Sequence, residues 1–416
     1  MDQDILRIQE SVIFDESVSH LETHAHQPYS ATNFTNNAEI RIAVQNQDLY
    51  VLPSRSSLHI TGRIANKTTE ADLARTDLIN NGICFLFDEI RYELNGVEID
   101  EIRNVGVTTS MKYLVSATPG QVNVNQNAGW YQDLGERGSV LLLQDAHGRF
   151  DVNIPMKNLL GFCEDYQKII VNAKHELILV RSNVDTNAVI QPEPTEAALA
   201  EDFKITLTYI EWMLPYVRPA DSQRVKLLGL INKNITIPMA YRTWELFEYP
   251  TLPQTDKVIW TVKTSTQLEK PRFVILGFKT SRKDNVTANA LLFDHNFLRN
   301  VKLYLNSQSY PYRQINASYA NHQFSLLYDM YTNFQSAYYG KENEPFMARY
   351  KFMNQAMLVV IDCSKQNENL KTGPVDVRLE IETTQNIIPN TSAYCLILHD
   401  RLVHYRPLSG DVTKQL

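Results

Sequence analysis

A few side chains in the sequence have types and spacings that could perform chemistry. His24 and His26 flank one alanine, so a strand would place both imidazoles on one face, as in the metal sites of cupins. A cupin site also needs a carboxylate a few residues further on and flanking glycines, whereas the next acid is Glu39 and no glycine is near. A solvated strand face is the simpler explanation, and a cupin-like metalloenzyme stays open as a minor alternative.

Two further pairs offer an acid beside a base. They are Asp145 with His147, and His399 with Asp400. Neither pair has a nucleophile or an oxyanion-binding loop in its sequence context. Polar residues at turns and strand ends explain both pairs.

Cys363 could be imagined as a nucleophile with His295 or His399 as its base. Nothing around it predicts a lowered thiol pKa, and a buried strand cysteine is the commoner case. The sequence also lacks GxGxxG, GxxxxGK[ST], HExxH and GxSxG motifs. We therefore expect a structural or binding protein that is not an enzyme, with no cofactor, no metal and no catalytic residues.

Length and composition limit the number of domains and the class of protein that the sequence can form. The chain has 416 residues, more than one core usually organises, so two domains are expected. The net charge of −7 argues against specific nucleic-acid binding. No run of about 18 apolar residues occurs, so no membrane span is expected. Four scattered cysteines are predicted to be buried, reduced thiols: Cys84, Cys163, Cys363 and Cys395.

Short strands dominate the predicted secondary structure. Apolar residues alternate with polar ones, which predicts strands with one buried face, over residues 40–44, 58–64, 203–209, 258–262 and 375–382. Residues 273–278 are apolar on both faces and predict a central strand. Helical patterns are few and short, and they cover residues 69–80, 104–116 and 323–338. The chain is therefore expected to be all-β with short helices in its loops.

Two nearly identical phrases indicate an internal duplication. LFDEIRYELNG occupies residues 86–96 and LFDHNFLRNVKLYLNS occupies residues 292–307. In the first phrase Asn95-Gly96 separates alternating runs, which is a strong signal for a type I′ hairpin turn. A two-residue turn would pair Leu94 with Val97, Glu93 with Glu98, Tyr92 with Ile99, and Arg91 with Asp100. Asn306-Ser307 takes the place of that turn in the second phrase.

A second echo supports the duplication. Residues 208–219 and 396–407 both end an aromatic-bearing strand with Arg-Pro. A polar junction at 218–224 lies between the copies, which predicts an N-terminal arm at 1–20 and domains at 21–219 and 220–416. A duplicated β unit of this size suggests two tandem eight-stranded jelly rolls. Two unrelated β domains that share common hairpin chemistry remain the alternative.

Long segments of the chain resemble a known family. They look like the double jelly-roll major capsid proteins of Polinton/Maverick elements and adintovirus-like viruses integrated in insect and other animal genomes. The resemblance runs from about residue 14 to residue 408. It is carried by HAHQPYS (24–30), IRIAVQNQDLYVLPS (40–54), IPMKNLLGFCEDYQKIIVNAKHELILVRS (154–182), VILGFKTSRKDN (274–285), NVKLYLNSQSYPY (300–312), LLYDMY (326–331), VIDCSKQNENLKTGPVDVRLEIET (360–383) and AYCLILHDRLVHY (393–405).

The resemblance implies a structural role. A chain of this family would self-assemble as a pseudo-hexagonal homotrimeric capsomer, tile an icosahedral virion capsid, and meet penton and minor or cement proteins. By the same analogy residues 115–139 form a candidate intersubunit loop with Trp130 and Tyr131 as anchors; a solvent loop with one aromatic pair is the alternative. A domesticated jelly-roll protein that binds a ligand or glycan is the alternative function.

Overall fold

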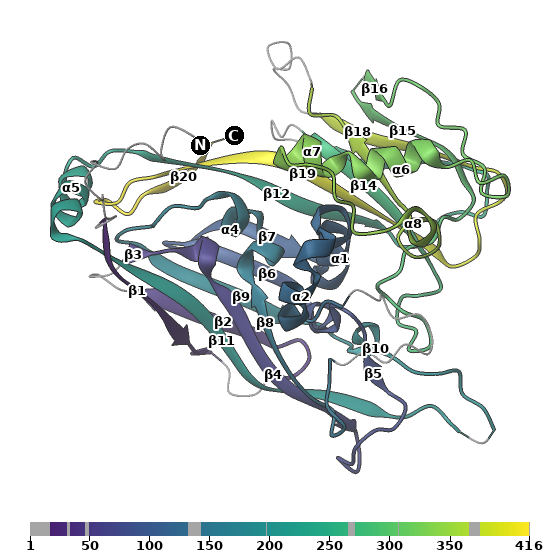
Figure 1. The fold of residues 1–416 in the computed structure, drawn as a ribbon, viewed down its shortest axis with the longest axis horizontal. Coiled ribbons are helices and arrows are strands. Elements are labelled where there is room, and N and C mark those ends of the chain that lie inside the picture. The colour runs from purple at the N-terminus through teal and green to yellow at the C-terminus, as the bar shows by residue number, and fades with distance from the viewer. Residues whose placement is uncertain are drawn as a thin grey trace, which may run out of the picture.

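The computed structural model describes residues 17–30, 34–45, 50–131, 143–196, 198–264, 271–306, 308–365 and 375–415. Two β-sandwiches lie against each other, the first drawn in purple to teal and the second in teal, green and yellow (Figure 1). None of the helices in these ranges is long and apolar enough to cross a membrane. The four cysteines are free and buried, as the sequence predicts.

The first sandwich contains two antiparallel sheets. One has the order β1-β11-β4-β8, with the short strand β3 also paired to β11. Its strands are β1 (Val18–His26), β3 (Tyr50–Val51), β4 (Ser57–Asn66), β8 (Arg149–Pro155) and β11 (Phe203–Pro219). The other has the order β2-β9-β6-β7. Its strands are β2 (Glu39–Gln45), β6 (Phe87–Leu94), β7 (Val97–Arg103) and β9 (Lys174–Arg181). A separate ribbon pairs β5 (Asp77–Leu78) with β10 (Val189–Ile190).

The second sandwich repeats this plan. One sheet has the order β12-β19-β14-β17, with β20 also paired to β19. Its strands are β12 (Ile237–Tyr249), β14 (Pro271–Thr280), β17 (Leu358–Asp362), β19 (Thr391–Tyr405) and β20 (Val412–Gln415). The other sheet has the order β13-β18-β15-β16. Its strands are β13 (Lys257–Thr264), β15 (Leu298–Leu305), β16 (Gln308–Tyr310) and β18 (Asp376–Thr383).

The two sandwiches have the same connectivity. Counting the eight main strands of each half along the chain, both halves join the first, eighth, third and sixth in one sheet and the second, seventh, fourth and fifth in the other. That order is a jelly roll. The prediction of an all-β fold with two tandem eight-stranded jelly rolls is confirmed.

Alternating burial explains why these segments are strands. In β18 the side chains of Val377, Leu379 and Ile381 are buried. Asp376, which precedes Val377, and Arg378, which follows it, face solvent. The inward residues of both sheets close the core of each sandwich, and period-two patterning of this kind fixes which face points inward. Residues 273–278 lie in β14, between β19 and β17, so the predicted central strand is confirmed.

Helices occupy corresponding loops of the two halves. The loop between β7 and β8 holds α1 (Val105–Ser116) and α2 (Val122–Asn125), and the loop between β16 and β17 holds α6 (Ser325–Thr332), α7 (Phe334–Tyr339) and α8 (Arg349–Gln355). Two short helices, α3 (Met156–Leu159) and α4 (Gly161–Asp165), follow β8. Helix α5 (Asp221–Asn232) joins the halves. The 3₁₀ turns are η2 (Pro53–Arg55), η3 (Gly82–Leu86), η4 (Pro119–Gln121), η5 (Gln126–Ala128) and η6 (Thr186–Ala188).

One of the three predicted helices is wrong. The helices at 104–116 and 323–338 correspond to α1 and to α6 with α7, but residues 69–80 form a loop that ends in β5. Glu70 has a φ of 55°, which breaks a helix. The carboxylate of Glu201 accepts the backbone N–H groups of Ala74 and Arg75, which a helix would direct to its own carbonyls.

The predicted hairpin is present, with a bulge that was not predicted. Leu94 pairs with Val97 and Glu93 with Glu98, but Tyr92 pairs with Asp100 instead of Ile99, and Arg91 pairs with Glu101. The register therefore slips by one residue at Ile99, and Ile99 and Asp100 are both buried although they are adjacent. A β-bulge redirects side chains in this way.

Both hairpin turns begin with an asparagine in the same conformation. Asn95 has a φ of 52° and Asn306 a φ of 55°. The Asn95 side-chain oxygen accepts the backbone N–H of Lys174 at 2.7 Å, and the Asn306 side-chain oxygen accepts that of Asp376 at 2.9 Å. Each turn therefore also fixes the start of the neighbouring strand, β9 in the first half and β18 in the second.

Candidate assembly site

The two jelly rolls meet along a polar seam whose centre is Arg242 of β12. Its guanidinium donates to Asp165 of α4 through Nε at 3.0 Å and Nη2 at 2.7 Å, and Nη1 donates to the Tyr338 carbonyl at 2.9 Å. The Arg242 backbone N–H also donates to Asp165 at 2.9 Å. Burial by itself would lower the pKa of Arg242, but the bonds to Asp165 raise it above its usual value. This bidentate pair fixes both the distance and the orientation of the halves.

A buried carboxylate lies further along the seam. Asp100, turned inward at the bulge of β7, accepts the hydroxyl of Thr243 at 2.7 Å and the backbone N–H of Phe162 at 2.9 Å. It is 1% exposed, and burial raises its pKa above the ordinary aspartate value. Next to it the Tyr241 hydroxyl donates to the Ile99 carbonyl. The bulge thus has a structural consequence, because it presents Asp100 to the second half.

The backbones of the two halves also touch. Gly161 begins α4, and a Cβ atom at this position would lie 1.8 Å from the Arg242 carbonyl oxygen. No larger residue fits there without moving the backbone of β12. The seam therefore depends on a glycine for its closest approach.

The loop helices of the two halves form a second part of the seam. The Tyr331 hydroxyl of α6 donates to the Leu114 carbonyl of α1 at 2.8 Å, and the Gln335 amide of α7 donates to the Ala117 carbonyl at 3.0 Å. The Tyr339 hydroxyl donates to Glu164 at 2.8 Å. These corresponding loops are therefore attached to each other and do not project separately.

A third contact joins the halves through a buried lysine. Lys279 of β14 is 4% exposed, and its ammonium donates to the Ala290 carbonyl. The ammonium also lies against three aromatic rings at 4.5–5.5 Å from their centroids: Phe85 of the first half, and Phe293 and Tyr394 of the second. Burial lowers the pKa of Lys279 to about 7.

The far end of the seam is closed by the C-terminal turn. The Tyr405 hydroxyl donates to the Val171 carbonyl at 2.6 Å, and the Asn172 side chain donates to the Pro407 carbonyl at 2.6 Å. The Asn95 amide of the hairpin turn donates to the Gly410 carbonyl at 2.8 Å. The halves are thus connected along their length, which gives one two-domain block.

The predicted intersubunit loop borders a cleft of about 500 Å³ between the halves. Trp130 is 3% exposed and its ring stacks on Tyr113 of α1 at 3.8 Å between centroids. Tyr131 is half-buried, with its backbone N–H donated to Asn80. Both residues therefore hold the loop onto its own protomer, and residues 132–139 of the predicted loop lie outside the described ranges. The contact of this loop with a neighbouring subunit stays a prediction.

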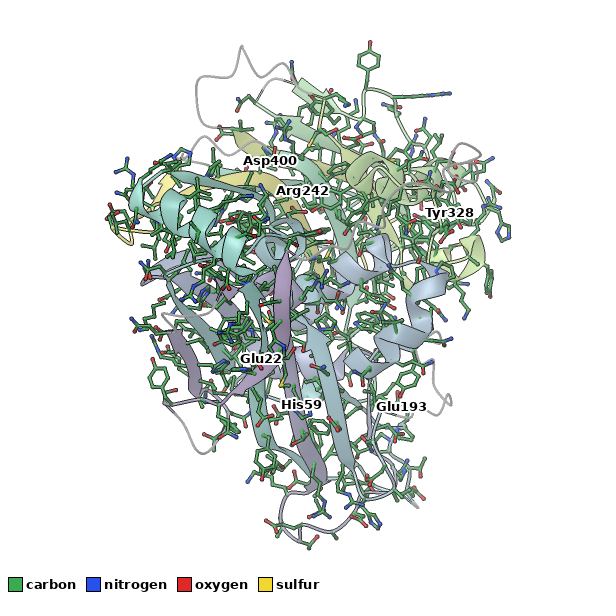
Figure 2. All side chains as sticks on the ribbon, turned by 60° about the vertical axis from the view of Figure 1, so that its left-hand side comes forward. Glu22, His59, Glu193, Arg242, Tyr328 and Asp400 are labelled. Carbon is green, nitrogen blue, oxygen red and sulfur yellow. The ribbon has the colours of Figure 1, made fainter. Side chains whose placement is uncertain are left out.

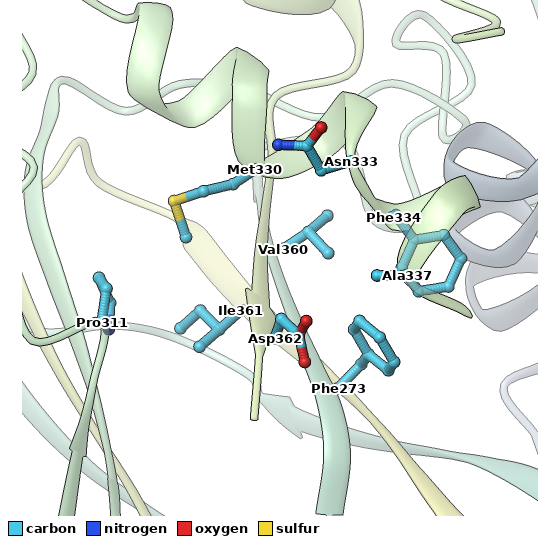
Figure 3. A pocket seen from close by; sticks show the side chains of 9 residues that line it. All are labelled: Phe273, Pro311, Met330, Asn333, Phe334, Ala337, Val360, Ile361 and Asp362. Atoms are coloured by element: carbon cyan, nitrogen blue, oxygen red, sulfur yellow. The ribbon is translucent and has the colours of Figure 1, made fainter. Parts of the chain in front are cut away.

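A smaller hollow of about 280 Å³ lies beside β17 in the second half. Met330 and Phe334 line it from α6 and α7, and Val360 and Ile361 line it from β17 (Figure 3). Its wall is mainly apolar, with one carboxylate, Asp362. The hollow does not bring together an acid, a base and a nucleophile.

The histidine pair of β1 lies far from the seam, as the separate positions of Glu22 and Arg242 show (Figure 2). His24 bonds the Glu22 carboxylate at 2.9 Å, and His26 bonds the Tyr216 hydroxyl at 2.9 Å. The hydrogen bond from His24 holds the pKa of Glu22 below its usual value. Among the described residues no group of three or more His, Cys, Asp or Glu side chains could hold a metal ion.

The acid–base pairs serve local structure. Asp145 accepts the backbone N–H groups of His147 and Arg149, which is a turn contact. His147 itself bonds Asp72 at 2.8 Å, and Asp400 pairs with Arg272 at 2.7 Å.

The candidate thiol, Cys363, lies in the core of the second half. The thiol of Cys363 is buried and donates to the Pro271 carbonyl at 3.4 Å. His295, one of its two candidate bases, stacks on Tyr319 at 4.2 Å between ring centroids. A buried thiol that donates to a backbone carbonyl is typical of a structural cysteine.

Two jelly rolls of the same strand order, locked by one seam, define a double jelly roll. A sequence model of the family described as the double jelly roll-like domain matches residues 76–403, and the chain belongs to this family. A search of curated proteins found no match.

Solved structures give the same fold. A chain of the Sputnik virophage structure has a TM-score of 0.65 and 12% identity, with 99% of this chain and 91% of that chain covered. The mavirus major capsid protein has a TM-score of 0.57 and 12% identity, with coverage of 99% and 92%. The Faustovirus major capsid protein has a TM-score of 0.54 and 8% identity, with coverage of 96% and 93%. At these identities the likeness establishes the fold.

Sequence reasoning missed the seam. Arg242, Asp165, Asp100 and Thr243 carry no motif, and 77 positions separate Arg242 from Asp165. One local signal was available, because the apolar residues after the Asn95-Gly96 turn are Val97, Ile99 and Ile102, so the two-residue alternation breaks between Ile99 and Ile102. A break of this kind inside a strand indicates a bulge.

Proposed function

We propose that this chain is a major capsid protein that self-assembles as a pseudo-hexagonal homotrimeric capsomer and tiles an icosahedral shell. The observation that carries this proposal is the rigid union of two jelly rolls of the same connectivity in one chain. The seam supports it further, because subunits of a shell need a fixed angle between their halves. The protein would act as a structural component of the virion, without catalysis.

Duplication explains the shape of the capsomer. A threefold ring of two-domain subunits contains six jelly rolls, so its outline is nearly hexagonal and packs efficiently into a lattice. The mavirus and Faustovirus major capsid proteins share the fold over most of this chain, which supports the same use of the fold. Such a trimer would bury more than ~2,000 Å², the range of obligate assemblies.

The lineage and the partners are part of the proposal. The sequence segments quoted above support membership in the Polinton/Maverick and adintovirus-like group. Penton and minor or cement proteins would complete the shell. Within the chain, we assign residues 1–20 to an N-terminal arm and residues 21–219 and 220–416 to the two jelly rolls.

Light scattering of the purified protein tests assembly directly. The expected mass is three times the 47.8 kDa of the chain, and electron microscopy should show hexagonal capsomers or closed shells. A protein that stays monomeric at micromolar concentration would overturn the proposal.

The intersubunit role of the loop can be tested separately. Val124 of α2 is 75% exposed next to the cleft, so Val124→Glu should weaken trimer or shell formation without changing the melting temperature. Leu199→Glu is the matched control, because Leu199 is 76% exposed on a different loop. Equal behaviour of the two variants would remove the loop from the interface and leave the trimer proposal standing.

A further inference from the structure

Helix α5 and the first residues of β1 carry an unusual concentration of exposed apolar side chains. Six large aliphatic side chains that are 45–69% exposed fall in two short segments of the chain. These segments lie next to each other, because the Ser17 carbonyl accepts the backbone N–H of Ala220. We call them the α5 surface: Val18, Leu21, Val225, Leu228, Leu230 and Ile235. Figure 1 shows α5 at one end of the molecule, away from α6, α7 and α8.

The helix is attached to the protein by only part of its circumference. Leu227 and Ile231, one turn apart, pack on a small cluster that includes Val171 and Val217. None of the residues of α5 is buried. A helix that is apolar beyond its packed side normally has a further partner.

The α5 surface is also basic, in a chain with a net charge of −7. Between residues 218 and 236 four basic residues stand against one acidic residue, Asp221, and they are Arg218, Arg224, Lys226 and Lys233. All four are exposed, and none forms an ion pair with another residue in the described ranges. The surface therefore combines apolar area with uncompensated positive charge.

The chain itself contains a segment of complementary composition. Residues 1–16 hold five acidic residues against one basic residue, Arg7, and they also hold Ile5, Leu6, Ile8, Val12, Ile13 and Phe14. This segment ends beside α5, because the Ser17 carbonyl accepts the backbone N–H of Ala220 at 3.0 Å. Val18 pairs with Pro219 immediately afterwards.

We infer that residues 1–16 dock on the α5 surface of their own chain. Apolar side chains of the segment cover Val225 and Leu228, and its carboxylates face the basic residues of α5. The inference concerns the single chain and does not depend on the capsid function.

Attachment at Ser17 favours the same chain over a second copy. Sixteen extended residues reach up to about 50 Å, whereas a helix of the length of α5 spans about 18 Å. A tether of this length gives an effective concentration in the millimolar range, so even weak contacts are occupied. Opposite charges add attraction that falls with salt.

Disulfide trapping in the full-length protein tests the inference. Ile5→Cys, Ile8→Cys and Val12→Cys are each combined with Val225→Cys and exposed to a mild oxidant; the native cysteines are buried and do not compete. A bridge requires Cα atoms within about 7 Å, so at least one pair should cross-link rapidly within one chain. The matched control replaces Val225→Cys by Leu326→Cys, on α6 and 42% exposed, and it should not cross-link.

The pattern of bands distinguishes the possible occupants. A bridge within one chain supports the inference. A bridge between two chains shows that a second copy covers the surface and overturns it, and so does the absence of a bridge from all three pairs. Vesicles containing anionic lipid serve as a parallel probe. If the protein floats with these vesicles in a manner that depends on Val225, and no disulfide bridge forms, the occupant of the surface is a lipid surface instead.

Proteolysis provides an independent readout. Docking should protect the bond after Arg7 from trypsin, and Val225→Glu with Leu228→Glu should raise cleavage there about tenfold, as should high salt. Leu326→Glu is the control and should leave the rate unchanged. Rapid cleavage in the unaltered protein that is insensitive to both the variant and the salt would overturn the inference.

Discussion

The two jelly rolls share a strand order but differ in what their hairpins contact. Asn95 and Asn306 both begin their turns with positive φ and both fix the start of the neighbouring strand. Asn95 additionally donates its amide to the Gly410 carbonyl of the other half. The contacts that the two asparagines share stabilise each jelly roll by itself, and the additional contact of Asn95 joins the two jelly rolls.

The same difference runs through the seam. The first half supplies carboxylates, such as Asp100 and Asp165, and the second half supplies donors, such as Arg242 and Thr243. Two identical surfaces could not complement each other in this way without symmetry between them. Divergence after duplication therefore specifies a single relative orientation of the halves.

The largest expected effect comes from closing the nearest approach of the halves. Gly161→Val places side-chain atoms against the Arg242 carbonyl, where a Cβ would lie at 1.8 Å. We expect a loss of about 3 kcal/mol or more in the free energy of unfolding, because backbone must move to relieve the overlap.

Urea denaturation measures this loss, and Gly229→Ala is its control. No atom lies within 4 Å of the position of a Cβ at Gly229 on α5, so alanine there should be neutral or slightly stabilising. Similar stabilities of the two variants would show that the halves are not held at the observed separation.

The second effect concerns the charge pair of the seam. Arg242→Ala leaves the Asp165 carboxylate, 15% exposed, without its bidentate partner. We expect a cost of about 2–3 kcal/mol, somewhat below the ~3–5 kcal/mol of fully buried pairs, because the Arg242 side chain is 27% exposed. Arg242→Lys should restore only part of the stability, since lysine cannot bind in the bidentate manner.

A surface pair provides the comparison for Arg242. Arg149 and Asp145 form an ion pair at 2.9 Å with side chains 65% and 42% exposed. Arg149→Ala should cost less than about 1 kcal/mol, because solvent screens the pair. Equal costs for the two arginines would mean that the seam contributes no more than an ordinary surface contact.

Much of the fold follows from the sequence because strands impose a strict two-residue alternation. This pattern located β2, β4, β11, β13 and β18, a run that is apolar on both faces located β14, and the Asn-Gly turn located the first hairpin. The helix predicted at residues 69–80 was wrong although the apolar spacing fits a helix. The carboxylate of Glu201, far away in sequence, accepts backbone N–H groups that a helix would use internally. The Arg242 pair joins β12 to helix α4 of the other half across 77 positions of sequence, and no local period records such a contact.

A pH-dependent prediction addresses the third contact between the halves. The pKa of Lys279 is about 7 when folded and ordinary, near 10.5, when unfolded. Between these values the unfolded chain binds a proton that the folded chain lacks, so stability rises with pH across this window. The neighbouring charges of Arg282, Asp294 and Glu248 face the same amine.

The measurement is the free energy of unfolding from pH 6 to pH 10 for the unaltered protein and Lys279→Met. We expect a difference in slope of about 1 kcal/mol for each pH unit in the window, because methionine keeps the volume and removes the titration. Parallel curves for the two proteins would show that Lys279 keeps an ordinary pKa, and that its contact with Phe85 is not desolvated.

The smallest expected effect separates the contacts of the two asparagines. Asn95→Gly and Asn306→Gly both permit the positive φ of the turn, so each variant removes only side-chain hydrogen bonds. Asn306→Gly loses the bond from the Asp376 N–H, whereas Asn95→Gly loses the corresponding bond from Lys174 and also the one to Gly410. A typical hydrogen bond contributes about 1 kcal/mol, so Asn95→Gly should be the less stable variant by about that amount.

The added flexibility of glycine in the unfolded chain is common to both variants and cancels in the comparison. Equal losses in thermal or urea unfolding would show that the contact with Gly410 adds nothing, and that the first hairpin serves its own jelly roll alone.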